Sequence, residues 1–202
     1  MSSKYPLIWN GPFKFPGLCV LHVLGDGSCL IHAVLLAYNQ DYRIERQGSR
    51  FVSRQDQAVQ FRHQLAHYLS MPSDPLQPGS PSQYLLLGRG NLPQVSIKFP
   101  QYTLDNMKKT LTTQESLDYM YFEPISDYIN KDIYVLDNQK QDVYLTGEED
   151  LYQKGRESII ILFTGNHYDL VGLSDDRGVI QTLFAPDHPL IEAIKRRQRS
   201  KR

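Results

Sequence analysis

Hydrophobic positions follow a helical pattern in the first half of the chain. Residues 29 to 38, CLIHAVLLAY, are apolar on nearly every side, which at this length predicts a buried helix starting at Ser28 or Cys29. A second helix is predicted over residues 53–70. Ser53 can cap its first turn, Asp56 follows three residues later, and apolar residues recur near one face.

The second half of the chain carries short apolar runs that are typical of strands. These runs are rich in β-branched and aromatic residues and are separated by turn residues. They span residues 133–137, 142–147, 158–163 and 167–173, with a further run at 179–184 and an early one at 18–24. Because helices come first and the strands cluster later, the pattern predicts an α+β domain.

Between these regions the pattern is less regular. Residues 71–81 contain four prolines and predict a loop, and residues 82–112 predict only a short helix from Leu104. Glu123-Pro124 opens another helix that runs to about Asn130, because proline is tolerated in the first helical turn.

The domain prediction is a single compact unit over residues 18–186. Residues 1–17 form an irregular arm laid on its surface, and residues 187–202 form a short helix that frays into a basic tail. A chain of 202 residues suits one such domain.

Charge is balanced overall but unevenly placed. The chain has 22 basic and 22 acidic residues, and six of the basic ones lie in the tail KRRQRSKR at residues 195–202. The acidic body argues against a dedicated nucleic-acid-binding domain, whose footprint is a basic face. A basic tail of this kind is typical of a solvated end or a nuclear-import signal.

The composition also bears on the cellular compartment. The chain has no run of about 18 apolar residues, no signal-like start, and only two cysteines, Cys19 and Cys29. We therefore expect a soluble, intracellular protein in a reducing compartment, without membrane contact and with the monomer as the default state.

Cys29 is the first candidate for chemistry. It follows the tight turn Asp26-Gly27-Ser28 and opens the predicted buried helix. A helix N-terminus favours the thiolate, which predicts a lowered thiol pKa, and the turn offers free backbone N–H groups around residues 26–29 for an oxyanion. The alternative is a small buried cysteine without a chemical role.

His167 is the best candidate for a base. Asp169 follows two residues later, so in a strand both side chains lie on the same face and the carboxylate can orient the ring. The alternative is a histidine at a strand edge beside a solvated aspartate. We expect the other histidines to have structural roles. His22 and His32, in apolar segments, are expected to pack in the core, His63 and His67 to lie on the surface of the second helix, and His188, before a proline, to cap a helix or form a turn.

Two motifs together resemble the ovarian-tumour (OTU) family of deubiquitinating cysteine proteases. They are DGSCLIHA at residues 26–33 and NHYD at residues 166–169, in the order and spacing of that family. The resemblance includes the helix-to-strand segment 123–137 and extends over residues 18–175. It departs from the family at Ile31, where an aromatic residue is more usual, and across residues 72–112.

The resemblance implies a fold and a reaction. The fold is a single papain-like cysteine-protease domain with a small, mostly antiparallel sheet of about five strands packed between helices. The reaction is hydrolysis of isopeptide bonds at the C-terminus of ubiquitin. Cys29 would be the nucleophile, His167 the base and Asp169 its orienter, and Asp26 would shape the oxyanion loop. Substrate-binding or oxyanion roles fall to Gly27, Ser28, Asn166 and Tyr168.

The resemblance also implies partners. They are ubiquitin and polyubiquitin chains, with ubiquitin-like modifiers as further candidates, and no metal or organic cofactor is required. An acidic body suits the arginines in the tail of ubiquitin. The alternative function is a catalytically weak or inactive module that binds ubiquitin or a ubiquitin-like modifier.

The compact, divergent form resembles OTU domains encoded by large DNA viruses. We expect a cytoplasmic protein, in the host cytoplasm if the origin is viral, and the basic tail offers access to the nucleus.

Overall fold

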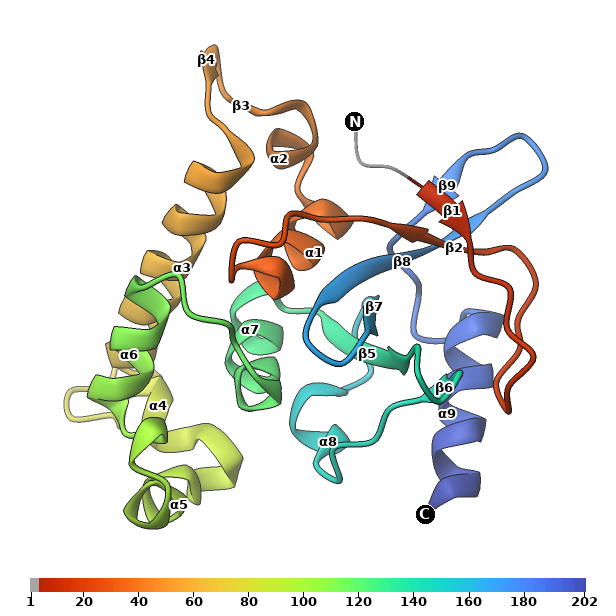
Figure 1. Ribbon diagram of the computed structural model, residues 1–202. Helices are drawn as coiled ribbons and strands as arrows, with labels where there is room; N and C mark the ends of the chain where they lie inside the picture. The colour runs from red at the N-terminus through yellow and green to blue at the C-terminus, as the bar shows by residue number, and fades with distance from the viewer. Residues whose placement is uncertain (1–3) are drawn as a thin grey trace.

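The computed structural model describes residues 4–202, and a mixed β-sheet runs through its centre (Figure 1). The described strands follow the order β1-β2-β8-β7-β5-β6, with β9 also pairing with β8. All neighbours are antiparallel except β5 and β7, which are parallel. The strands are β1 (Lys4–Pro6), β2 (Leu18–Leu21), β5 (Asp132–Asp137), β6 (Asp142–Val143), β7 (Ser158–Phe163), β8 (Tyr168–Ser174) and β9 (Ile180–Gln181).

Helices cover both faces of this sheet. Those in the described chain are α1 (Cys29–Tyr38), α2 (Gln40–Ile44), α3 (Arg54–Ser70), α4 (Gln83–Leu86), α5 (Leu92–Lys98), α6 (Leu104–Thr112), α7 (Phe122–Ile129), α8 (Glu149–Tyr152) and α9 (Pro189–Lys201). Short 3-10 helices span Leu87–Gly90, Pro100–Tyr102 and Tyr119–Tyr121. A separate hairpin, β3 (Arg46–Gln47) with β4 (Arg50–Phe51), projects beyond α2 and α3 (Figure 1).

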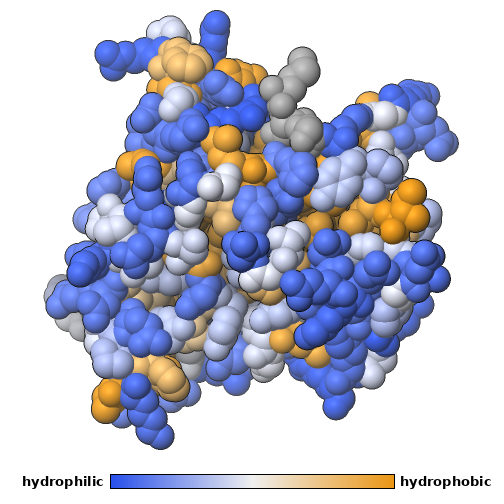
Figure 2. Space-filling view, in the orientation of Figure 1, coloured by the Kyte–Doolittle hydropathy of each residue, from blue (hydrophilic) through white to orange (hydrophobic). Residues whose placement is uncertain are grey.

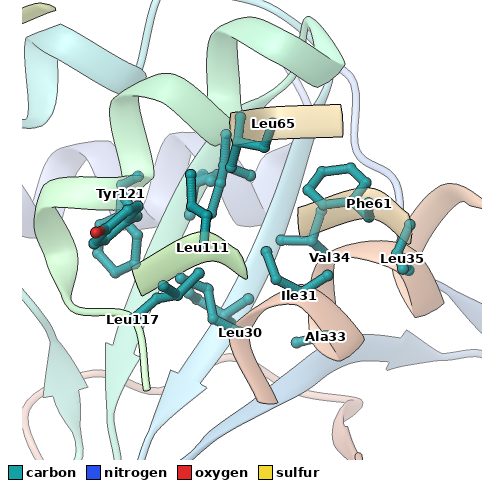
Figure 3. Close-up of a cluster of buried hydrophobic side chains, with 14 of the residues drawn as sticks. Leu30, Ile31, Ala33, Val34, Leu35, Phe61, Leu65, Leu111, Leu117 and Tyr121 are labelled. Carbon is teal, nitrogen blue, oxygen red and sulfur yellow. The ribbon is translucent and has the colours of Figure 1, made fainter. Parts of the chain in front are cut away.

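Alternation along the central strands divides the core into two layers. In β5, Ile133 faces the first layer and Tyr134 the second, and in β7 Ile159 and Ile160 divide in the same way. The first layer lies under α1, α3, α6 and α7, where Leu30 and Ile31 of α1 contact apolar side chains of α3 and α6 (Figure 3). This arrangement buries α1 on nearly every side, as its sequence predicts.

The second layer corrects the prediction for both ends of the chain. Residues 4–6 form strand β1, and Trp9 and Phe13 are buried against the sheet, so this segment is more than an irregular arm. The C-terminal helix α9 does not fray but continues to Lys201, and its buried Leu190 packs in the same layer. Both ends therefore contribute to the core.

The predicted fold class is confirmed: the protein is a compact α+β domain with a mostly antiparallel sheet. The predicted bounds of α1 and β7 match the structure, and Ser53 caps α3 by accepting the backbone N–H of Asp56. Two predicted strands are much shorter, since β6 and β9 have only two residues each. Among the described residues, no helix has the length and apolarity needed to cross a membrane.

Candidate active site

Cys29 is the first residue of α1 and lies against the start of β8. Its side chain is buried, and the backbone N–H of Tyr168 lies close enough to the thiol to lower its pKa. Because Tyr168 directly follows His167, the thiol lies beside the loop that carries the candidate base. Residues far apart in the sequence thus meet where α1 packs on β8.

The helix N-terminus does not lower the pKa of the Cys29 thiol as predicted. Burial raises the pKa of the Cys29 thiol above its ordinary value, and this effect outweighs the backbone N–H groups of Tyr168, Leu30 and Cys29, which lower it. The nearby carboxylate of Asp169 adds to the increase. The expectation of a lowered pKa was wrong, because the apolar surroundings of α1 disfavour the thiolate more than the helix favours it.

His167 and Asp169 form the pair that their spacing predicts. The ring Nε2–H of His167 donates to Oδ1 of Asp169 at 3.1 Å, and the Asp169 side chain is only 1% exposed. This bond leaves the other ring nitrogen, Nδ1, as the proton acceptor of a neutral imidazole. Nδ1 lies on the side of Gly25, since a methyl group at Gly25 would stand 3.9 Å from it. The basic atom of His167 therefore borders the turn that leads into Cys29.

A second histidine shares the Asp169 carboxylate. His22, directly after β2, donates from Nδ1 to Oδ2 of Asp169 at 3.0 Å, and the N–H of Val23 donates to Oδ1 at 3.0 Å. The expectation that His22 only packs among apolar neighbours was wrong, because its ring is 49% exposed and bonded to the site. No local pattern around His22 predicts this bond, because the pairing depends on β2 lying beside β8.

The turn before Cys29 is fixed by close backbone packing. Gly27 has a φ of +82°, and a methyl group there would stand 1.9 Å from the carbonyl oxygen of Gln114. Only glycine meets both demands, the left-handed conformation and the lack of a side chain. The segment after α6 is thereby pressed against the turn that opens α1.

Asp26 and Ser28 also hold this turn. Asp26 accepts the backbone N–H of Ser28 and the Nε2–H of buried His32, whose Nδ1 accepts the Tyr42 hydroxyl at 2.7 Å. Burial would raise the pKa of Asp26, but its hydrogen bonds from His32 and from the Ser28 N–H hold it below the ordinary value. The N–H of Ser28 is thus engaged by Asp26 and is not free for an oxyanion, contrary to expectation.

Arg62 of α3 makes more hydrogen bonds around the candidate site than any other residue described above, and no pattern in the sequence pointed to it. Its side chain is 1% exposed and makes five hydrogen bonds. Two of them reach the catalytic turn, at the Gly27 carbonyl (3.2 Å) and the Ser28 hydroxyl (3.1 Å). The other three reach the carbonyls of Thr110, Leu111 and Glu115. Burial lowers the pKa of Arg62, while the nearby carboxylates of Asp26 and Glu115 favour its charge without bonding to it directly.

Comparisons with known proteins identify this architecture. No protein-family model and no curated protein sequence matches the chain. Among solved structures, one described as an ovarian tumor (OTU) domain in complex with ubiquitin is 20% identical, covers 89% of this chain and 81% of its own, and has a TM-score of 0.51. The chain has the OTU fold.

Other solved OTU structures are similar at lower scores. An OTU deubiquitinase from Wolbachia pipientis wMel is 12% identical, with 91% of this chain and 98% of that one covered and a TM-score of 0.44. The viral OTU domain protease from Farallon virus is 12% identical, with 81% and 96% covered and a TM-score of 0.40. At such identities the likeness concerns the fold, so the roles of individual residues rest on the geometry of this chain.

Two further candidate residues of the OTU fold lie at the mouth of the site. The ring of Tyr168 is half-buried between Phe122 and Phe163, and burial raises the pKa of its hydroxyl. It is therefore a neutral apolar wall beside Cys29. Asn166 is exposed in the turn before His167 and is free to meet a substrate.

An acidic groove lies between α5, α7 and α8. Its lining includes Glu123, Glu148 and Asp150, together with Arg89, which is ion-paired with Asp150, and the apolar Leu92 and Val95. Three carboxylates and one guanidinium in the lining give the groove a net negative charge, which favours a basic segment.

Proposed function

We propose that the protein is a thiol-dependent deubiquitinase that hydrolyses isopeptide bonds at the C-terminus of ubiquitin in polyubiquitin chains or conjugates. The single observation that carries the proposal is that α1 packs on β8, which brings the Cys29 thiol beside the His167–Asp169 pair. The OTU fold supports it, and one similar structure is described as an OTU domain bound to ubiquitin.

The first chemical step is acylation of Cys29. His167 Nδ1 takes the thiol proton as the sulfur attacks the carbonyl of the C-terminal glycine of ubiquitin. The imidazolium that forms is stabilised by Asp169 through the Nε2–H bond. His167 then protonates the lysine amine, the C–N bond breaks, and a thioester remains on Cys29.

The second step releases ubiquitin. His167 Nδ1 takes a proton from water, the hydroxide attacks the thioester, and the proton returns to the Cys29 sulfur as the C–S bond breaks. Because burial raises the Cys29 pKa, the attack requires a base, and His167 fills that role in the proposed mechanism. The backbone N–H groups of Gly27 and Cys29 are the candidate oxyanion donors, since that of Ser28 is occupied.

The surface around the site fits the proposed substrate. The arginines of the ubiquitin tail suit the net negative charge of the groove, where Glu148 is exposed beside the Arg89–Asp150 ion pair, and the narrow Gly-Gly end suits the apolar wall of Tyr168. Apolar side chains are also exposed nearby on α5, where Ile97 is 73% exposed and orange atoms reach the surface in Figure 2. Such a face can bury apolar surface of the ubiquitin body.

The test is reaction with a ubiquitin that carries an electrophile at its C-terminus, read by intact mass. We expect one adduct on the wild-type chain and none on Cys29→Ala, which should still bind ubiquitin. Cys19→Ala is the matched control, because Cys19 is the other free, buried cysteine and lies on β2. It should react like the wild type.

Failure of the well-folded wild type to react would contradict the proposed activity. Ubiquitin binding without reaction would favour the alternative, a catalytically inactive binding module. A linkage panel on the active chain would then identify the preferred polyubiquitin.

A further inference from the structure

His22 bonds to the buried carboxylate of Asp169 from a different part of the chain, directly after strand β2. Asp169 sits on β8 and is 1% exposed, whereas His22 follows β2 and is 49% exposed. The Tyr5 ring of β1 leans on His22 with 5.1 Å between ring centroids. The three strands β1, β2 and β8 are neighbours in the sheet, so this arrangement is held by the core.

The two oxygens of Asp169 are used differently. Oδ1 accepts from His167 Nε2 and from the Val23 N–H, while among the described residues only His22 donates to Oδ2. A buried carboxylate oxygen that loses its single donor is costly, and the side chain then turns or draws in water. Such a rotation would move Oδ1 away from His167.

We propose that His22 is a positioning residue that holds the Asp169 carboxylate in the rotation that orients His167. His22 acts through its Nδ1–H bond to Oδ2 and does not touch the reacting atoms. This inference rests on the proposed roles of Cys29, His167 and Asp169, but not on ubiquitin as the substrate. With the Oδ2 bond in place, the Nε2–H tautomer of His167 is retained and Nδ1 stays available for the thiol proton.

The experiment replaces His22 in two ways. His22→Leu removes the N–H donor but keeps an apolar side chain over Asp169. His22→Gln keeps an N–H donor on a side chain of different shape. The first readout is the rate of Cys29 alkylation by iodoacetamide at neutral pH, resolved from Cys19 by peptide mapping, so no ubiquitin is needed. We expect Leu to slow alkylation about ten-fold and Gln to stay within about three-fold of the wild type.

A second readout separates positioning from a general loss of structure. Histidine labelled with ¹⁵N reports the tautomer of His167, which should be the Nε2–H form in the wild type and His22→Gln, and averaged in His22→Leu. His63→Leu is the matched control, because His63 is exposed on α3 and should change neither readout.

Two outcomes overturn the inference. One is wild-type alkylation and tautomer in His22→Leu. The other is equal loss in the Leu and Gln variants, since the N–H donor would then be irrelevant. If wild-type protein ignores the ubiquitin probe while alkylation still depends on His22 as expected, the proposed substrate fails and the positioning role of His22 stands.

Discussion

The candidate site joins two halves that are built in different ways. In the sheet half, around Asp169, side chains are positioned by hydrogen bonds to another side chain: one buried carboxylate accepts from His167 and His22. In the helix half, around Gly27 and Ser28, the backbone is positioned by a side chain: the buried guanidinium of Arg62 donates to carbonyls from three segments of the chain.

The difference follows from what each half must present. A base needs a defined tautomer and charge stabilisation, which a carboxylate can supply. An oxyanion site needs backbone N–H groups at fixed positions. A cation bonded to the carbonyls of the same turn can fix the turn and leave its N–H groups available to the oxyanion. Defects in the sheet half should therefore reduce activity with little loss of stability, while defects in the helix half should reduce both.

The largest expected effect comes from the sheet half. Asp169→Leu removes the acceptor of His167 Nε2–H and should lower kcat on a ubiquitin conjugate about a thousand-fold. Asp169→Asn should cost much less, about ten-fold, because its amide oxygen can still accept from His167 and its nitrogen can donate to His22. Steady-state kinetics on both variants would check the order.

The expected order would be contradicted if Asp169→Leu and Asp169→Asn lowered kcat equally. The charge of Asp169, rather than its acceptor geometry, would then dominate. Unfolding in urea is the accompanying measurement. Asp169→Asn, which keeps hydrogen-bonding groups toward His167 and His22, should lose no more than about 2 kcal/mol.

The next effect concerns the helix half. Arg62→Lys keeps the charge but offers at most three donors for five acceptors, so carbonyls around the catalytic turn lose partners. We expect a loss of about 3 kcal/mol in the free energy of unfolding and a drop in kcat of about ten- to a hundred-fold. Urea unfolding and steady-state kinetics measure the two effects.

Arg156→Lys is the matched control for this variant. Arg156 also bonds several groups, the carboxylates of Asp127 and Asp132 and the Ser126 hydroxyl, but none belongs to the catalytic turn. It should lose stability and keep kcat. Equal loss of kcat in both variants would show that Arg62 acts through general stability alone.

The sequence predicted the sheet half better than the helix half. His167 and Asp169 are two positions apart, so the period of a strand places both on one face, and the structure bonds them. Cys29 was found through its glycine turn and the apolar helix behind it. His22 was missed because its contact with Asp169 spans 147 positions and depends on strand pairing.

Arg62 was missed for a different physical reason. Its partners are mostly backbone carbonyls, which every residue has, and the Gly27 carbonyl lies 35 positions away. The short helices α4 and α5 were missed because, with four and seven residues, they are too short to show a regular apolar period. The docking of α9 depends on ion pairs with β6, such as Arg197 with Asp142, 55 positions apart.

The smallest effect on activity is expected at Asp142, a buried carboxylate outside both halves. It accepts from Arg197 at 2.8 Å and is paired with Lys201 at 3.1 Å, both on α9. Burial would raise its pKa, but these bonds and the Val143 N–H lower it from 3.8 to about 2. Asp142→Asn should therefore keep wild-type kcat while losing about 2 kcal/mol of stability at neutral pH.

The pH dependence makes this variant a test of the comparison. Because the pKa is lower in the folded state, the stabilisation from Asp142 is complete well above pH 3.8 and is lost as the pH falls toward about 2. The difference in unfolding free energy between wild type and Asp142→Asn should shrink over that window. If Asp142→Asn instead lowered kcat as Asp169→Leu does, loss of any buried carboxylate would impair activity, and the special place of Asp169 beside His167 would not be needed to explain it.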